Sequence, residues 1–127
     1  MASQAFPKTF RLLRRSDYRR VYDEGQRRSV SLCTVFIRPN GLAHSRLGIT
    51  VPARLGNAVL RNRLKRRVRE VFRLLRADLP TGWDFLVNPR PAVATVSFQA
   101  LEKELQRLFC QAASKGQRSP AKQEAKS

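Results

Sequence analysis

The chain has 127 residues, enough for one domain with a modest core and too few for two independent cores. Its 26 Lys and Arg against nine Asp and Glu give a formal charge of +17, an excess usually tolerated because a polyanion neutralises it. Nucleic acid is therefore the first expected partner and an anionic membrane surface the second; with no long apolar run and no secretory signal, we expect a cytoplasmic protein.

The first predicted element is a helix of about two turns in the segment RRSDYRRVYDEGQ. Tyr18, Val21 and Tyr22 fall at i, i+3 and i+4, which places them on one helical face. Gly25 follows this pattern, and we expect it to end the helix in a left-handed turn.

Three short segments rich in β-branched and aromatic residues predict a sheet. The runs VSLCTVFIRP and SRLGITVP are separated by an Asn-Gly turn signal, so we expect them to form an antiparallel pair. GWDFLVNP is a third strand with prolines at its end. In the first run, Thr34 and Phe36 share one face, which leaves Cys33 and Val35 for the other.

The C-terminal part contains a predicted helix followed by a predicted disordered tail. Apolar residues recur at helical spacing from Ser97 through FQALEKELQRLFCQAA, which predicts a long amphipathic helix. The final segment has no periodic apolar residues and is expected to be disordered. We therefore divide the chain into one domain over residues 1–114 and a disordered basic tail over residues 115–127.

The most heavily charged element is a helix predicted over residues 57–77, with Asn57 as its N-cap. Six apolar residues fall within an arc of about 100° and are expected to pack on the sheet. They are Leu60, Leu64, Val68, Val71, Phe72 and Leu75. The opposite arc carries Asn62, Lys65, Arg66, Arg69, Arg73 and Arg76, with Arg63 and Arg67 at its flank and Arg61 near the edge of the apolar stripe.

This one-sided charge has two interpretations, a solvated surface or an anion-binding face. A solvated surface usually mixes its signs, but only Glu70 offers the helix an internal partner. Like charges four residues apart, such as Lys65 and Arg69, destabilise an isolated helix. Together with the total charge, this pattern favours anion binding.

Catalysis by the protein itself has little support in the sequence. His44 is the only histidine and has no evident partner for a Ser-His-Asp or Cys-His arrangement. The acids are dispersed, whereas two-metal hydrolysis needs several that converge, and no glycine-rich nucleotide loop is present. Cys33 and Cys110 form neither a disulfide framework nor a zinc site, so we expect two buried thiols.

Several segments match one family in order and spacing: LLRRSDYRRVYDEG, the pair CTVFIRP and SRLGITV, the block ARLGNAVLRNRLKRRVREVFR, and DFLVNPR. Over about residues 8–112 the chain resembles the protein subunit of bacterial ribonuclease P, and the Arg-Asn-Arg block is the most specific part of the resemblance. The resemblance implies an α+β fold, a two-layer α/β sandwich similar to the second domain of ribosomal protein S5. It further implies a mixed sheet of about four strands with a left-handed βαβ crossover.

The resemblance also implies a function. The protein is expected to bind the catalytic RNA subunit of ribonuclease P and the 5′ leader of precursor tRNA, and to assist endonucleolytic removal of that leader. In that family the hydrolytic centre and its Mg²⁺ ions belong to the RNA. The protein alone is therefore expected to be inactive and to bind no cofactor, no membrane and no small-molecule substrate.

Two sets of site residues follow from the resemblance, position by position. Those expected to contact the catalytic RNA are Arg61, Asn62, Arg63, Lys65, Arg66, Arg69 and Arg73. Those expected to hold the single-stranded leader in a cleft are Tyr18, Tyr22, Thr34, Phe36 and Arg54. Aromatic rings suit such a cleft because they stack on bases of any sequence. The alternative that these rings belong to the core stays open, above all for Tyr22.

The chain departs from the family pattern at two positions. Ala53 precedes Arg54 where a second basic residue is common, and Asn88 stands where an apolar residue is usual. The alternative function is a ribosomal-type or RNA-chaperone protein outside any enzyme assembly. An aromatic cleft for a free strand would distinguish the two functions, because a structural RNA-binding protein needs only the basic helix.

Overall fold

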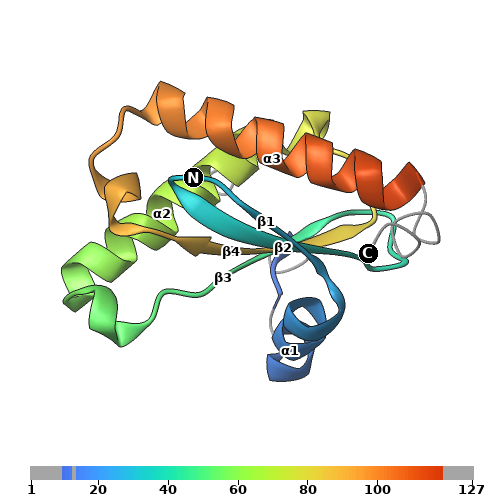
Figure 1. The fold of residues 1–127 in the computed structure, drawn as a ribbon, viewed down its shortest axis with the longest axis horizontal. Helices are drawn as coiled ribbons and strands as arrows, with labels where there is room; N and C mark the ends of the chain where they lie inside the picture. Colours follow the sequence, from blue (N-terminus) through green and yellow to red (C-terminus); the bar gives the residue numbers. More distant parts are fainter. Residues whose placement is uncertain (1–9, 13, 119–127) are drawn as a thin grey trace, which may run out of the picture.

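The computed structural model describes residues 10–12 and 14–118 as three α-helices, four strands and short 3₁₀ turns (Figure 1). The helices are α1 (Arg15–Glu24), α2 (Ala58–Leu75) and α3 (Phe98–Arg118). The strands are β1 (Gln26–Ser29), β2 (Cys33–Pro39), β3 (Arg46–Ile49) and β4 (Trp83–Pro89). The 3₁₀ turns are η3 (Ala53–Leu55), η4 (Arg76–Asp78) and η5 (Pro91–Ala94).

The strands form one mixed sheet in the order β1-β2-β4-β3. β2 pairs antiparallel with both β1 and β4, whereas β3 runs parallel to β4, and α2 connects these two parallel neighbours. The runs VSLCTVFIRP and SRLGITVP, predicted to form an antiparallel pair, correspond to β2 and β3. This prediction is wrong, because β4 lies between the two strands. Five consecutive residues of β4 are buried, as expected for a strand covered on both faces.

The Asn-Gly pair builds a longer loop instead of a two-residue hairpin. The Asn40 side chain accepts from Leu42 N at 2.7 Å and donates to the His44 carbonyl and to Asp84 Oδ1. Gly41 takes a positive φ of 73° in this loop. The turn signal was correct, but the loop separates the strands enough for β4 to enter.

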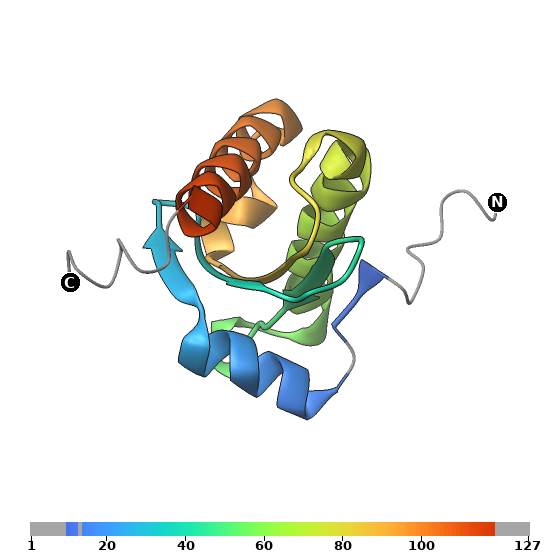
Figure 2. The ribbon, with the colours of Figure 1, turned by 90° about the vertical axis from the view of Figure 1, so that its right-hand side faces the viewer.

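Helices cover both faces of the sheet unequally. α2 and α3 lie together on one face, and α1 lies alone on the other (Figure 2). The main core fills the space between the sheet and the α2–α3 layer, and its centre is an aromatic cluster. Phe72, Phe85 and Phe109 are fully buried, with ring centroids 4.6–6.1 Å apart. The α+β class with a mixed four-stranded sheet is confirmed.

The predicted apolar stripe of α2 packs as expected. Five of its six members are buried, and the sixth, Leu60, is half-buried against the same core. The predicted N-cap is also confirmed, since Asn57 Oδ1 accepts from Leu60 N at 2.9 Å. The element that carries most of the charge is therefore anchored by its opposite side.

The helix α1 ends differently from the prediction. Gly25 is extended, with φ −79° and ψ 161°, so no left-handed turn is present. Glycine is needed there for space: a Cβ would lie 2.5 Å from the Val21 carbonyl oxygen and 2.9 Å from that of Ile37. The chain thus passes directly from α1 into the edge strand β1, whose polar sequence QRRS did not indicate a strand.

The C-terminal helix continues past the predicted domain boundary. α3 ends at Arg118, four residues into the segment expected to be a disordered tail, and residues 119–127 of that segment lie outside the described residues. Cys33 is buried on the core face, whereas Cys110 is only half-buried. None of the helices in the described part of the chain is both long and apolar enough to span a membrane.

Candidate nucleic-acid interface

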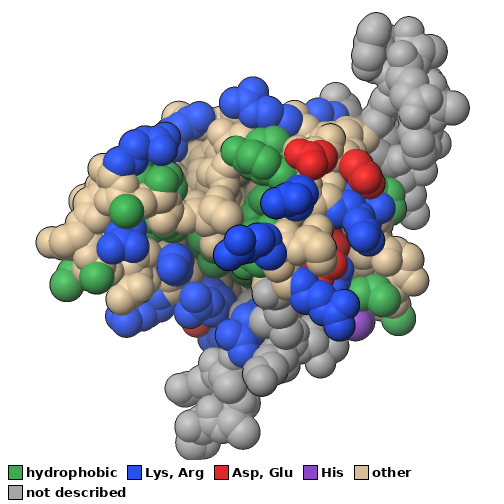
Figure 3. Space-filling model, turned by 90° about the horizontal axis from the view of Figure 1, so that it is seen from below, with side chains coloured by type: hydrophobic (Ala, Val, Ile, Leu, Met, Phe, Trp, Pro, Cys, Tyr) green, Lys and Arg blue, Asp and Glu red, His purple; other side chains and the backbone are tan. Residues whose placement is uncertain are grey.

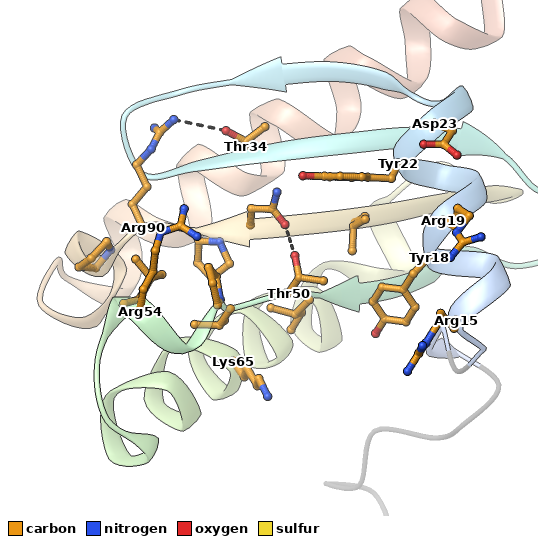
Figure 4. Close-up of a pocket in the computed structure, with 18 residues that line it drawn as sticks. Arg15, Tyr18, Arg19, Tyr22, Asp23, Thr34, Thr50, Arg54, Lys65 and Arg90 are labelled. Atoms are coloured by element: carbon orange, nitrogen blue, oxygen red, sulfur yellow. Dashed lines mark hydrogen bonds between the residues drawn. The ribbon is translucent and has the colours of Figure 1, made fainter.

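A groove with a volume of about 1160 Å³ lies on the face of the sheet that α1 covers (Figure 4). Tyr18 and Tyr22 extend into it from α1, and Arg19 also lines it, while Arg54 and Arg90 flank its opposite end. Among the described residues, five cations line the groove, Arg15, Arg19, Arg54, Lys65 and Arg90, and Asp23 is the only carboxylate that does so. The groove is therefore a positively charged channel with two aromatic residues along one wall.

Strand alternation produces this groove. Thr34 and Phe36 of β2 lie opposite Asn88 and Leu86 of β4, and Thr34, Asn88 and Leu86 line the groove floor. The residues between them in each strand, such as Val35, point into the main core. The predicted division of the two faces of the first β-rich run is confirmed.

The helix α1 approaches the sheet closely at one glycine. A Cβ on Gly48 would lie 2.7 Å from Leu12 Cδ1 and 2.9 Å from Tyr18 Cε2. Gly48 thus makes room for the Tyr18 ring against β3. That contact fixes one end of α1, and the groove opens beyond it.

The rings of Tyr22 and Phe36 are in contact, and of the two only Tyr22 is accessible. The Tyr22 side chain is 55% exposed, whereas Phe36 is 8% exposed. Their ring centroids are 4.6 Å apart, with the planes tilted by 54°. The alternative that Tyr22 is a core residue is therefore excluded. The structure places Phe36 below the groove surface instead of in its wall, in a small cluster with Leu12, Val21 and Leu86, where it supports Tyr22.

Tyr18 is half-buried between the groove and β3. Burial raises the pKa of its phenol, and a hydrogen bond with the Ile49 backbone and the charges of Arg69 and Arg11 oppose that rise. The hydroxyl is therefore protonated at neutral pH. It can donate a hydrogen bond to an anion.

The far end of the groove has a polar floor that the sequence did not indicate. Thr34 Oγ1 lies 2.9 Å from Ser29 Oγ and accepts from Arg90 Nη2 at 3.3 Å. Thr50 Oγ1 donates to Asn88 Oδ1 at the same level of the sheet (Figure 4). Asn88, which departs from the family pattern, is therefore a floor residue of the groove.

Several lining cations were absent from the predicted leader-binding set. Arg15 and Arg19 are exposed on α1, and Arg90 follows β4. Helical spacing had linked Tyr18 to Tyr22, so the same spacing from Arg15 to Arg19 was an available signal. No sequence signal pointed to Arg90, because its place beside the groove depends on how β4 pairs. Arg54 lies in η3 and lines the groove as predicted, and its neighbour Ala53 is exposed without lining it.

The basic face of α2 divides into two groups by contact. Asn62 and Arg66 are exposed, and Lys65 and Arg69 are half-buried beside the α1 face; none of these four donates a side-chain hydrogen bond to another described residue. The other predicted RNA-binding residues have internal acceptors: Arg61 Nε donates to the Gly56 carbonyl at 3.1 Å, Arg63 Nε to the Ala94 carbonyl at 2.9 Å, and Arg73 to Glu70. Lys and Arg side chains surround the α1 face as a whole (Figure 3).

Most acids near this face are already paired. Asp84 is 2% exposed and accepts two hydrogen bonds from Arg46, at 2.9 and 2.8 Å, and one from Asn40. Arg46 also reaches Asp17 of α1 at 3.7 Å, so this cluster ties α1 to the sheet. The His44 ring packs edge-on against Phe10, outside the groove. Within residues 10–12 and 14–118, no group of three or more His, Cys, Asp or Glu is placed to hold a metal ion.

Comparisons with known proteins agree with this geometry. The family model described as Ribonuclease P matches residues 6–113. The ribonuclease P protein component of Thermotoga petrophila is 36% identical over 111 residues, covering 84% of this chain and 95% of the relative, and that of Escherichia coli O157:H7 is 38% identical over 110 residues, covering 86% and 92%. Among solved structures, the RNase P protein of Thermotoga maritima superposes with a TM-score of 0.73 at 36% identity, covering 80% of this chain and 96% of that one. The RNase P protein of Staphylococcus aureus superposes with a TM-score of 0.69 at 31% identity, covering 79% of this chain and 92% of that one.

Proposed function

The chain belongs to the ribonuclease P protein family, and from that premise we propose that its groove holds the single-stranded 5′ leader of precursor tRNA while the outer face of α2 contacts the catalytic RNA. As a member of the family it is a subunit of the ribonucleoprotein enzyme that processes tRNA 5′ ends, and its partner is the ribonuclease P RNA.

The observation that carries the proposal for the leader is the exposed, supported ring of Tyr22. Phe36 holds this ring from below at 4.6 Å, so its outer side stays open without a loss of packing. Stacking of a base on such a ring contributes ~1–3 kcal/mol and does not depend on the base. A ring that tolerates any base therefore suits a single strand of any sequence.

The charges at the two ends of the groove suit a strand that crosses it. Arg15 and Arg19 lie beside the tyrosines, and Arg54 and Arg90 lie at the far end, so backbone phosphates can be neutralised along the whole path. This arrangement favours the leader-binding function over the alternative of a structural RNA-binding protein, which needs no open aromatic ring.

The outer face of α2 suits duplex or folded RNA. Asn62 and Arg66 point to solvent with no internal partner among the described residues, whereas Arg61, Arg63 and Arg73 combine an internal hydrogen bond with further free N–H groups. We expect Arg66 and Arg69 to make the principal phosphate contacts.

The protein's part in the reaction is positioning. Hydrolysis is assigned to Mg²⁺ ions held mainly by the RNA in the cytoplasmic holoenzyme, and the described lining of the groove contributes a single carboxylate, that of Asp23. By fixing the leader, the protein would hold the scissile phosphate in register with the RNA's own centre.

The test is a series of precursors whose leaders lengthen one nucleotide at a time. With catalytic RNA and protein together, affinity should rise with leader length until the groove is filled and then stay constant, and cleavage should give 5′-phosphate mature ends. With catalytic RNA alone the rise should be absent. Arg54→Gln should reduce the rise, and Lys103→Gln, an exposed charge on α3, should not. A length dependence that is the same with and without protein would refute the proposal, as would metal-dependent cleavage by RNA-free protein.

A further inference from the structure

The face of the sheet under α1 carries side chains in three rows that run across β2, β4 and β3. The row at one end is charged, the middle row is apolar, and the row at the other end is polar and lies in the groove floor. From the strand registers, the rows are Arg38, Asp84 and Arg46; Phe36, Leu86 and Gly48; and Thr34 with Asn88. The charged row and the polar floor therefore lie at opposite ends of the same face.

Two acids of α1 pair with the two arginines of the charged row. Asp17 Oδ2 lies 3.7 Å from Arg46 Nη1, and Glu24 Oε1 accepts from Arg38 Nε at 2.9 Å. The acids are seven residues apart in the helix, which places them on one helical face and roughly 10 Å apart along its axis. The arginines lie on strands separated by β4, again roughly 10 Å apart. The two spacings match, and α1 crosses the strands of the sheet (Figure 4).

We propose that Asp17 and Glu24 are positioning residues for the leader. Through these two ion pairs, here called the α1 clamp, they hold α1 at the charged end of the sheet and keep the groove open. The proposal rests on the leader-binding function proposed above and deepens it, because Tyr18 and Tyr22 of the groove wall lie between the two acids on the same helix. Neither acid is among the described residues that line the groove, so both act through the helix and not through contact with RNA.

Apolar packing alone holds α1 weakly. Among the ten residues of this helix, all of them described, only Val21 is buried, and the N-cap residue Arg14 makes no side-chain capping bond. A helix this short is marginal in water without tertiary contacts. The ion pairs to the sheet therefore contribute a large share of what fixes the helix in place.

One anchor of the α1 clamp is held rigidly by the sheet. Arg46 donates two hydrogen bonds to the buried carboxylate of Asp84, at 2.9 and 2.8 Å, and Asn40 donates a third at 2.9 Å. Ordering two long side chains is a main cost of a surface ion pair, and an arginine fixed in this way has little left to lose. The Asp17 carboxylate can therefore gain from pairing with Arg46 even at 3.7 Å.

Two general effects of acids predict the opposite of the α1 clamp at Glu24. A carboxylate in the last turn of a helix opposes the helix dipole, and a carboxylate on an RNA-binding protein repels the RNA. On both grounds, removing the Glu24 charge would stabilise α1 and strengthen binding, whereas loss of the clamp would loosen α1 and weaken binding. Asp23 is the matched control, because it lies one residue earlier in the same turn and has no ion pair with another described residue.

The experiment uses the assembled holoenzyme and measures the ratio of precursor to mature tRNA affinity. Glu24→Gln and Asp17→Asn should each lower this ratio about two- to fivefold, the range of a single surface ion pair. The double variant should lower it about tenfold, because the free energies of sites this far apart are nearly additive. Asp23→Asn should raise the ratio, and Asp17→Glu, which keeps the charge, should stay close to wild type.

Amide hydrogen exchange of the free, full-length protein gives a second measurement that does not depend on RNA. The amides of α1 should exchange faster in Glu24→Gln and Asp17→Asn than in Asp23→Asn, while those of α2 should be unchanged. An equal acceleration in both helices would show a general loss of stability and would overturn the proposal.

The proposal is also overturned if Glu24→Gln and Asp17→Asn match Asp23→Asn in the affinity ratio and in hydrogen exchange. Tyr22→Ala separates it from the leader-binding function, because Tyr22 lines the groove and takes no part in the α1 clamp. If Tyr22→Ala lowers the ratio and the two acid variants do not, the clamp is rejected and leader binding is kept. If Tyr22→Ala leaves the ratio unchanged while α1 exchanges faster in the acid variants, leader stacking is rejected and the clamp is retained.

Discussion

The two faces of the sheet are built from the same strands and have opposite character. Under α2 and α3, residues such as Val35, Phe85 and Val87 are fully buried in a continuous apolar core. Under α1, only a small cluster around Phe36 and Leu86 is sealed, and the rest of the face is an open, cationic groove. A period of two in each strand thus lets one sheet supply stability on one side and binding on the other.

Covering a sheet face incompletely is what creates the site. α1 is ten residues long and contacts the sheet through Val21, Tyr18 and the Arg46 cluster, so it cannot cover the polar floor at Thr34 and Asn88. The predictions that follow test whether the two faces are energetically separate.

The largest effect is expected from the core face. Phe85→Ala removes a ring that packs against Phe72 and Phe109, and such truncations cost ~3–5 kcal/mol of unfolding free energy. Urea denaturation of the free protein should show this loss. In the fraction that remains folded, the ratio of precursor to mature tRNA affinity in the holoenzyme should equal that of wild type; a changed ratio would show that the faces are coupled.

Phe36→Ala should affect both properties, because this ring lies under Tyr22 within the smaller cluster. We expect a loss of about 3 kcal/mol in unfolding free energy and a lower precursor-to-mature affinity ratio. Denaturation and holoenzyme binding measured on the same preparation give the two numbers. Phe36→Leu is the control. It keeps most of the side-chain volume, so the unfolding free energy should return closer to wild type than the precursor-to-mature affinity ratio does.

Tyr22→Ala should separate the two properties. The side chain is 55% exposed, so unfolding free energy should change little, while precursor binding should lose ~1–3 kcal/mol through one missing stacked base. Mature tRNA, which has no leader, should bind as before. An equal loss for both tRNAs would mean that Tyr22 acts on assembly instead of on the leader.

On α2, Arg66→Gln and Arg63→Gln should differ although both remove one charge. Arg66 has no internal partner among the described residues, so its loss should lower the salt slope of catalytic-RNA binding by ~0.9 and leave stability unchanged. Arg63 donates to the Ala94 carbonyl, so its loss should cost about 1 kcal/mol of unfolding free energy. Identical behaviour of the two variants would show that the internal hydrogen bond is immaterial.

The smallest effect at neutral pH concerns Cys33, the core-side neighbour of Thr34. Burial raises the pKa of its thiol to about 12. In the unfolded chain the thiol ionises near ~8.5, so its contribution to stability is complete below that pH and is lost as pH rises toward 12. Alkylation at pH 8 should therefore label Cys33 only through unfolding, and Cys33→Ala should flatten the loss of stability measured between pH 9 and 11. Fast labelling of native protein would mean that the core face is open.

The sequence pattern within a segment correctly predicted the features that depend on that segment alone. The apolar stripe of α2 and the split between Thr34 and Val35 follow from periodicity, the Asn57 cap follows from residue type, and all three are confirmed. The partner of β3 did not follow, because parallel pairing with β4 depends on residues far along the chain. Whether Tyr22 or Phe36 is the open ring depends likewise on how α1 sits on the sheet, and no spacing within α1 contains that information.

The position of β4 also bears on how the protein is made. It lies between β2 and β3, with Cys33 paired to Pro89 and Ile49 to Val87, but it is the last of the described strands to leave the ribosome. Until residues 83–89 emerge, β2 and β3 each present an unpaired edge, on a nascent chain extended at roughly 5–20 residues per second. Folding must therefore wait for long-range closure, which slows it and leaves these edges open to pairing with other chains. Over that interval the partly made chain carries two unpaired strand edges, a condition that favours aggregation of nascent chains.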